Sequence, residues 1–193
     1  VSTGINTDVS AARNSISNSA AANTKNTVIK NDDDYNDNYS TGISGVGSWV
    51  AKYPGELGNS LKVSVCPSAQ AWQNTVSGAI AVTTQTTSVS GNGTFFTTQL
   101  VAGDILELGP DRQKVKVASI ANNISLVLDS KYTGNTITIN STHSTGVNRY
   151  WEFYNFFDVA PGTSVFADTQ GGSGDELHMV VVDEDGQWTG VQN

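Results

Sequence analysis

The chain has 193 residues and a net charge of −8 at pH 7, and only 15% of its residues are charged. Its ten Lys and Arg residues are scattered, which argues against the clustered positive charge that binds nucleic-acid phosphates. The single cysteine, Cys66, excludes an internal disulfide and any multi-cysteine metal site, and no stretch approaches the roughly 20 apolar residues of a membrane-spanning helix. The 19 glycines and the runs of Ser, Thr and Asn indicate a turn-rich β protein.

The N-terminal part of the chain predicts little buried structure. Residues 1–26 are rich in Ser, Ala and Asn and carry few large apolar side chains. A short helix capped by Asp8 or Ser10 and a linker draped over the surface both fit this composition. Because the chain begins with Val1 and not with Met, we expect it to be a piece of a longer protein.

The acidic run NDDDYNDN, residues 31–38, invites comparison with a calcium-binding loop. Its first, third and fifth loop positions hold Asp32, Asp34 and Asn36. Asp37 stands where such a loop needs Gly for its sharp turn, and Ile43 stands where it needs a bidentate Glu. The sequence therefore predicts a solvated acidic turn, with an adventitious cation site as the alternative, and no dedicated metal site.

The segment from Gly47 to Val65 predicts a strand, a rigid turn and a second strand. In the second strand, Leu61, Val63 and Val65 alternate with polar residues, so we expect these three side chains to face a core. The residues expected to form the structural turn are Tyr53, Pro54, Gly55, Gly58 and Asn59. Proline fixes its own φ, and we expect a positive φ or a close approach of the backbone at Gly55 or Gly58. The Cys66 side chain is expected to be buried.

Residues 76–141 predict an inserted β-module. Short apolar runs follow one another closely and are separated by Gly-, Asn- and Asp-rich turns, which is typical of a small antiparallel barrel or sandwich. The side chains expected in its core are Phe95 or Phe96, Leu100, Ile105, Leu108, Val117, Ile120 and Leu126.

The C-terminal part predicts buried strands. The aromatic segment Arg149–Phe157 reads as a core strand, and LHMVVV, residues 177–182, reads as a central strand. The hairpin turn expected after it consists of Asp183, Glu184, Asp185 and Gly186, with Gln187–Gly190 beginning a return strand. We expect these strands and Leu61–Val65 to form one sheet.

The predicted fold class is therefore α+β and predominantly β. We expect residues 1–75 and 142–193 to form a mixed-sheet domain. The first 40 or so residues of the chain are expected to be linker-like. This domain is interrupted by the β-module of residues 76–141.

No complete catalytic constellation is present in the sequence. The two histidines, His143 and His178, are far apart, and the chain has no G-x-S-x-G nucleophile elbow. The carboxylate pairs Asp175/Glu176 and Asp183/Asp185 crowd predicted turns, where solvated acidic loops are ordinary. We therefore expect a protein that is not an enzyme and that holds no catalytic residue, cofactor or metal.

Two stretches of the sequence resemble a known family. KYPGELGNSLKVSV, residues 52–65, and GSGDELHMVVVDEDGQWTG, residues 172–190, are similar to the tail sheath proteins of contractile-tailed bacteriophages. In that family a YPG–LGN turn precedes a core strand, and a DELH–VVVDEDG–WTG hairpin follows later in the same domain. We call these two stretches the first and second sheath-like motifs.

The resemblance implies a structural subunit of the virion, used in genome ejection through the host envelope. It implies an outer domain of the sheath that polymerises with other copies around the tail tube, after assembly in the host cytoplasm. Contact with the tube would come from domains absent here, and neither nucleic acid nor a membrane is an expected partner. A carbohydrate-binding or adhesin β-domain displayed on a virion is the alternative that the Asn- and Thr-rich loops allow.

Overall fold

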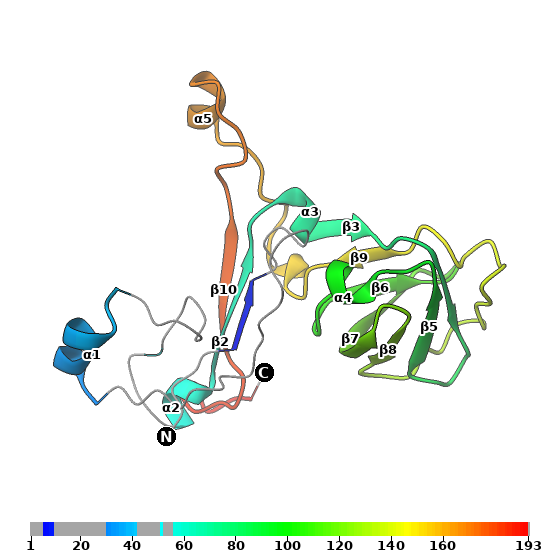
Figure 1. Cartoon of the computed structure of the whole chain (residues 1–193), viewed down its shortest axis with the longest axis horizontal. Helices are drawn as coiled ribbons and strands as arrows, with labels where there is room; N and C mark the ends of the chain where they lie inside the picture. Colours follow the sequence, from blue (N-terminus) through cyan, green and yellow to red (C-terminus); the bar gives the residue numbers. More distant parts are fainter. Residues whose placement is uncertain (1–5, 10–29, 42–50, 52–55, 193) are drawn as a thin grey trace. The chain divides into compact units, whose positions relative to one another are not determined.

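A computed structural model of the chain describes residues 6–9, 30–41, 51 and 56–192 (Figure 1). They form a predominantly β protein with antiparallel strand pairs and few helices. The chain divides into two compact units: unit 1 comprises residues 1–9, 18–65 and 179–193, and unit 2 comprises residues 10–17 and 66–178. None of the helices in the described ranges has the length and apolar character needed to cross a membrane.

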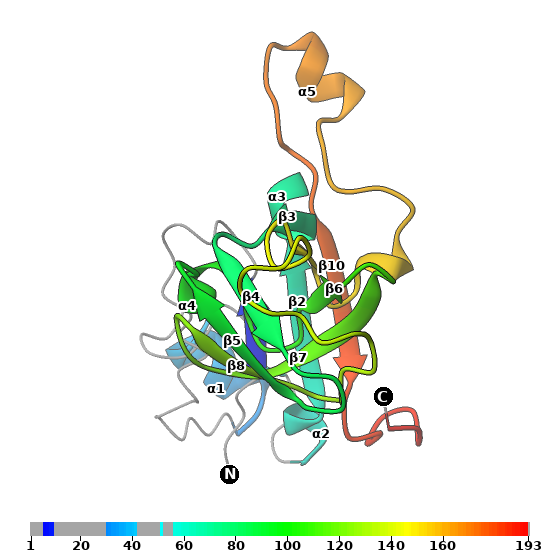
Figure 2. The same ribbon diagram turned by 90° about the vertical axis from the view of Figure 1, so that its right-hand side faces the viewer.

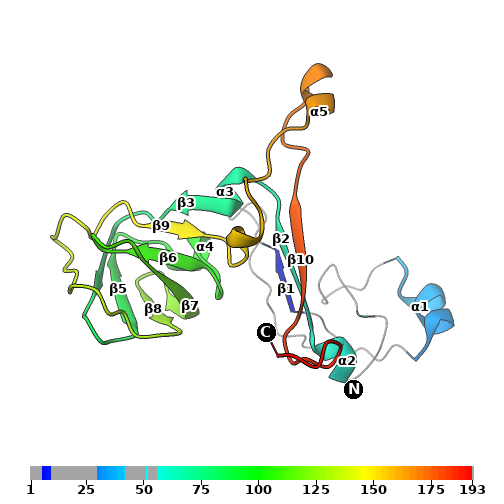
Figure 3. The same ribbon diagram turned by 180° about the vertical axis from the view of Figure 1, so that it is seen from behind.

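Unit 1 is built on a three-stranded sheet. Its strand order is β1 (Asn6–Val9), β2 (Leu61–Cys66) and β10 (His178–Asp183). β1 is parallel to β2, with Asn6 opposite Lys62. Figures 1 and 3 show that β2 and β10 run in opposite directions, so the last residue of β2 and the first residue of β10 lie at the same end of the pair.

The strand expected before Cys66 is confirmed, but its expected alternation is wrong. In β2, Val63, Ser64 and Cys66 are buried, whereas Leu61 and Val65 are only partly buried. β2 lies between two neighbours in the sheet, and its buried residues include the polar Ser64 on the face opposite Val63. Cys66 is buried, as expected.

Of the residues expected in the structural turn before β2, only Gly58 and Asn59 are described, so the conformation expected at Gly55 or Gly58 stays a prediction. Gly58 and Asn59 belong to the short helix α2 (Glu56–Asn59), and Gly58 is not among the glycines with positive φ. Tyr53, Pro54 and Gly55 lie outside the described residues. At the N-terminus, Asp8 belongs to β1, which pairs with β2, and the residues after it that were expected to form a capped helix or a linker lie outside the described residues.

The acidic run forms a helix, so the predicted acidic turn is wrong. Helix α1 (Asp32–Asn38) begins after Asn31, whose side chain accepts a hydrogen bond from the Asp34 backbone N–H at 2.8 Å. The Asp34 carboxylate accepts from the Lys30 N–H and from the Asn38 amide, at 2.9 and 3.0 Å. Three acidic residues in the first turn also complement the positive end of the helix dipole. These carboxylates therefore stabilise a helix.

Unit 2 is built on a seven-stranded sheet with antiparallel pairings (Figures 1 and 2). The strand order is β3 (Gln73–Thr75), β9 (Asn148–Tyr150), β6 (Ile105–Leu108), β7 (Gln113–Asn122), β8 (Ser125–Leu128), β5 (Ser88–Asn92) and β4 (Ala79–Val82). The ten-residue β7 joins the two halves, because its first part pairs with β6 and its second part pairs with β8. Irregular pairing along its second part bends the sheet over its own core.

Four short helices connect these strands or follow them: α3 (Ala69–Trp72), α4 (Phe96–Gln99), the 3-10 helix η1 (Tyr154–Phe156) and α5 (Val165–Thr169). The core inside the sheet runs from Val76 to Val147 in the sequence. Of its expected members, Phe96, Leu100, Leu108, Val117 and Leu126 are buried. Ile105 and Ile120 are partly buried, and Phe95 is exposed.

The aromatic segment lies in unit 2, so its expected place in one sheet with Leu61–Val65 is wrong. Arg149 and Tyr150 belong to β9, which pairs with β3 and β6. The Arg149 side chain is 2% exposed and donates to the backbone carbonyls of Gln70 and Ala71 at 2.6 and 2.7 Å. These bonds hold the segment against α3.

The β-module of residues 76–141 stays a prediction, but its sheet also contains β3 and β9. We therefore expect residues 66–178, produced alone, to unfold in one cooperative thermal transition followed by circular dichroism. Residues 76–141 should not, because they lack β9, which pairs with the edge of β6, and Val147 of the core. Equal midpoints for the two fragments would contradict this expectation.

Two glycines with positive φ provide a matched test of packing in unit 2. At Gly78 (φ +78°) an added Cβ would lie 2.5 Å from the Asn92 carbonyl oxygen, whereas at Gly146 (φ +70°) it would meet nothing within 4 Å. Gly146→Ala should cost only the left-handed backbone penalty, about 1–2 kcal/mol. Gly78→Ala adds a clash of about 1–3 kcal/mol. Equal losses in chemical denaturation would contradict the close approach at Gly78.

Candidate functional site

The two sheath-like motifs meet in unit 1. Ser60, the residue before β2, donates a hydrogen bond from its hydroxyl to the carboxylate of Asp183, the last residue of β10. The backbone N–H of Glu184 donates to the Ser60 carbonyl oxygen at 2.7 Å. Ser60 is fully buried and Asp183 is 7% exposed. The two motifs, separated in the sequence by more than a hundred residues, therefore share one buried junction.

The Asp183 carboxylate organises the chain that follows it. Its Oδ1 accepts from the Gln187 backbone N–H at 3.1 Å, and its Oδ2 accepts from the backbone N–H groups of Trp188 and Thr189 at 2.9 and 2.8 Å. The Thr189 hydroxyl adds a further bond to Oδ2 at 3.0 Å. The turn closes where the Gly190 N–H donates to the Gly186 carbonyl at 2.8 Å.

Ser60 and Trp188 complete this junction. The Ser60 Oγ accepts from the backbone N–H groups of Asp185 and Gln187, at 3.2 and 3.4 Å, while its proton goes to Asp183. The Trp188 indole N–H donates to the Leu57 carbonyl oxygen at 2.7 Å. Residues of both motifs thus hold each other through side-chain and backbone bonds.

The return strand expected at Gln187–Gly190 is wrong. Residues 187–189 form a turn, and no strand follows Asp183 in the described part of the chain. The reason is that the carboxylate takes three consecutive backbone N–H groups, which a β-ladder would otherwise use. Glu184 and Asp185 form bends and Gly186 has a φ of +71°, but in the described part of the chain no strand pairs back to make the expected hairpin.

The environment of Asp183 determines its ionisation. Burial opposes the charged form, but the donors from Ser60, Thr189 and Trp188 outweigh it and hold the pKa of the carboxyl well below its ordinary value. Glu184 instead forms a surface ion pair with Lys62, whose Nζ lies 3.5 Å from the carboxylate. Because the Asp183 carboxylate accepts from several donors, we interpret it as a structural anion.

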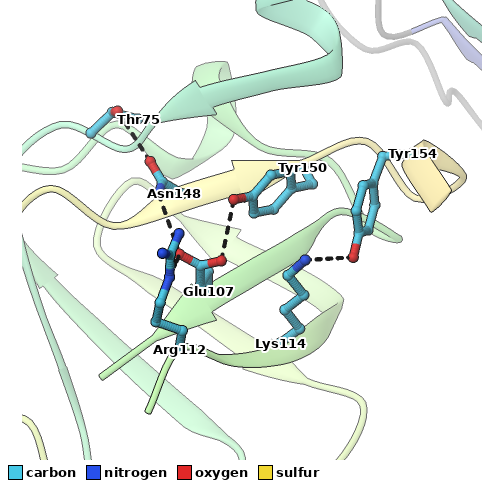
Figure 4. A network of polar contacts seen from close by, with 7 residues as sticks. All are labelled: Thr75, Glu107, Arg112, Lys114, Asn148, Tyr150 and Tyr154. Carbon is cyan, nitrogen blue, oxygen red and sulfur yellow. Dashed lines mark hydrogen bonds and ion pairs between the residues drawn. The ribbon is translucent and has the colours of Figure 1, made fainter. Parts of the chain in front are cut away.

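A second polar network lies on β6, β7 and β9 of unit 2 (Figure 4). The Glu107 carboxylate accepts from Arg112 Nε at 2.8 Å, from Tyr150 Oη at 3.2 Å and from the Asn148 amide at 3.4 Å. Burial opposes its ionisation, but these donors, Arg112 foremost, lower its pKa. Lys114 Nζ lies 4.7 and 4.6 Å from the ring centres of Tyr150 and Tyr154, and the bond to the Tyr154 hydroxyl raises the pKa of Lys114.

The remaining candidates from the sequence lie in structural settings. His178 stacks on Phe157 at 4.1 Å, and its Nε2 lies 2.8 Å from the Val159 carbonyl oxygen, whereas His143 is exposed in a loop. Asp175 bonds the Ser164 hydroxyl and backbone N–H, and these bonds lower its pKa. Within the described ranges, no group of three or more His, Cys, Asp or Glu side chains is placed to hold a metal ion.

No family model, curated relative or solved structure matches the chain. The two sequence motifs and the geometry that joins them are therefore the features that bear on function. Sequence reasoning identified Asp183 as a turn residue but missed its partner Ser60, which is separated from it by 123 positions. A local signal did exist, since a strand that ends in Asp before G-x-W-T offers a carboxylate to the N–H groups of the next turn.

The lowered pKa of Asp183 predicts how the stability of unit 1 depends on pH. The stabilisation is present above the unfolded-state pKa of about 3.9 and is lost as the pH falls toward the lower folded-state value. Asp183→Asn cannot accept the same set of bonds, so we expect it to be less stable than the wild type at pH 7. The difference in denaturation midpoint should shrink below about pH 4.

The matched control for this prediction is Asp185→Asn, which changes an exposed acid two residues away. Its denaturation midpoint should follow the wild-type midpoint at every pH. Parallel pH curves for the wild type and Asp183→Asn would contradict the structural role of the ionised carboxylate.

Proposed function

We propose that this chain is an outer segment of the subunit of a contractile phage tail sheath, with a structural and not a catalytic role. The observation that carries the proposal is the junction of Ser60 and Asp183, which brings the two sheath-like motifs together in unit 1. Two stretches that resemble the same family and also share a buried junction are better explained by descent from one domain of that family than by two separate chance similarities.

The course of the chain supports the finer part of this proposal, a mixed-sheet domain interrupted by an inserted β-module. The chain leaves the three-stranded sheet at Cys66 and returns to it at His178, and these residues end and begin neighbouring antiparallel strands. The intervening residues 66–178, a longer stretch than the residues 76–141 predicted as the module, form most of unit 2, which has its own buried core. Such a unit can be added between two strands without changing their pairing.

The proposal includes partners and location. Other copies of the subunit are the main partners, and contact with the tail tube is made by parts of the subunit other than this segment. The particle assembles in the host cytoplasm and the protein is then part of the virion tail. Neither a nucleic acid nor a cofactor takes part, in keeping with the scattered basic residues and the net charge of −8.

One observation favours the alternative, a carbohydrate-binding or adhesin domain. Tyr150 and Tyr154 bring two rings together, with centres 4.9 Å apart, beside the amide of Asn148 and the carboxylate of Glu107. Rings and polar groups of this kind can contact the faces and hydroxyls of a sugar. Here, however, Lys114 lies over both rings and Glu107 already accepts three hydrogen bonds, so the network is satisfied within the protein.

The sheath proposal and the adhesin alternative can be distinguished by measuring the assembly state of the protein. We expect the 193-residue chain to sediment as a monomer at micromolar concentration, because no segment of it matches the polymerising arms of sheath proteins. The full-length protein should form rings or tubes visible by electron microscopy. A stable ring formed by the 193-residue chain would move the assembly contacts into this segment. A full-length protein that stays unassembled yet is retained on a glycan affinity gel would favour the adhesin.

A further inference from the structure

Residues 158–177 form an arm that is cross-linked by its own polar side chains. The Glu176 carboxylate accepts from the Gly162 N–H at 2.9 Å, and Asp175 accepts from the Ser164 N–H and hydroxyl at 2.8 and 2.6 Å. The Gly174 N–H donates to the Thr163 hydroxyl at 2.9 Å. These bonds join the outgoing and returning halves of the arm, so its conformation is defined without a buried apolar core.

The far end of the arm presents two apolar side chains. Helix α5 begins after Ser164, whose hydroxyl accepts from the Ala167 N–H at 3.1 Å. Its first two residues, Val165 and Phe166, are 82% and 77% exposed. Figures 1 and 2 show α5 at the end of the arm, away from the seven-stranded sheet of the same unit. Single exposed apolar residues are common, so their partner has to be inferred from a separate property.

That property is charge. Residues 150–193 contain no Lys or Arg, whereas ten acidic residues balance the ten basic ones in residues 1–149, so the net charge of −8 belongs to residues 150–193. The arm itself carries four exposed acids: Asp158, Asp168, Asp175 and Glu176. An apolar tip within an acidic arm is complementary to an apolar pocket with a basic rim. The same charge disfavours anionic lipid, nucleic acid and the arm of a second copy.

We propose that the arm is a docking element that inserts Val165 and Phe166 into an apolar pocket of a partner protein, where Lys and Arg at the rim face the acids of the arm. The internal bonds position the tip before binding, so little ordering entropy is lost on docking. This inference is independent of the sheath proposal, because it uses only the geometry and charge of unit 2.

The probe for this test is a synthetic amphipathic peptide made of Leu and Lys, titrated into the ¹⁵N-labelled 193-residue chain and followed by NMR. We expect the amide signals of residues 162–176 to shift and to saturate at a lower peptide concentration than those of α1. Helix α1 is the internal control, because it carries four acids, Asp32, Asp33, Asp34 and Asp37, and its aromatic residue Tyr35 is only 40% exposed, compared with 82% and 77% for Val165 and Phe166. Equal affinity at α1 and at the arm would reduce the interaction to charge alone and overturn the proposal.

Variants separate the two contributions. The double variant Val165→Ser/Phe166→Ser should weaken peptide binding at the arm by about tenfold or more, since two apolar side chains no longer leave water. The double variant Asp158→Asn/Asp168→Asn should also weaken peptide binding at the arm, and its binding should depend less on salt concentration than that of the wild type. The control Phe95→Ser changes another exposed aromatic residue of unit 2, 54% exposed, and should leave binding unchanged.

Two results would overturn the proposal. The first is unchanged affinity in Val165→Ser/Phe166→Ser when its other amide signals show the fold to be intact. The second is a shift of the arm signals with protein concentration alone, without peptide, which would identify a second copy as the occupant.

Discussion

Unit 1 depends on an ionised carboxylate that is almost shielded from water. Taking a charge out of water is costly unless donors replace the lost hydration, and Asp183 receives them from the Ser60 and Thr189 hydroxyls and from three backbone N–H groups. All except Ser60 lie within six residues after Asp183. The cost of burying the charge is therefore offset only when the end of β10, the turn after it and Ser60 before β2 are together, so this one group holds these three parts of unit 1 in place.

Unit 2 is held in a different way. Its strands surround an apolar core, and its buried charge, Arg149, faces two backbone carbonyls and Asp104, whose carboxylate lies 3.8 Å away. Each unit thus has its own source of stability. Such independence supports the insertion proposed above, because a unit with its own core can be added between two neighbouring strands without replacing their pairing.

Local patterns predicted much of the fold, and long-range partners were missed. The alternation in LKVSV predicted the strand β2, although not which of its side chains are buried. The short apolar runs predicted most of the core of unit 2. The sequence predicts the wrong sheet for the aromatic segment, because its periodicity indicates burial but not which strands pair with it. The hydrogen bonds of Arg149 hold the segment against α3. The prediction of a return strand after Asp183 is wrong for a related reason. The sequence shows an Asp–Gly turn, but it does not show which backbone N–H groups donate to the carboxylate.

The most direct test of this account is hydrogen exchange at the backbone amides of Trp188 and Thr189. Both residues are exposed and belong to a turn, so only the bonds to Asp183 would slow their exchange. We expect slow exchange in the wild type and fast exchange in Ser60→Ala, because this substitution removes the hydroxyl donor that the other motif supplies to Asp183. Exchange as fast in the wild type as in an unstructured peptide would contradict the claim that this carboxylate joins the two motifs.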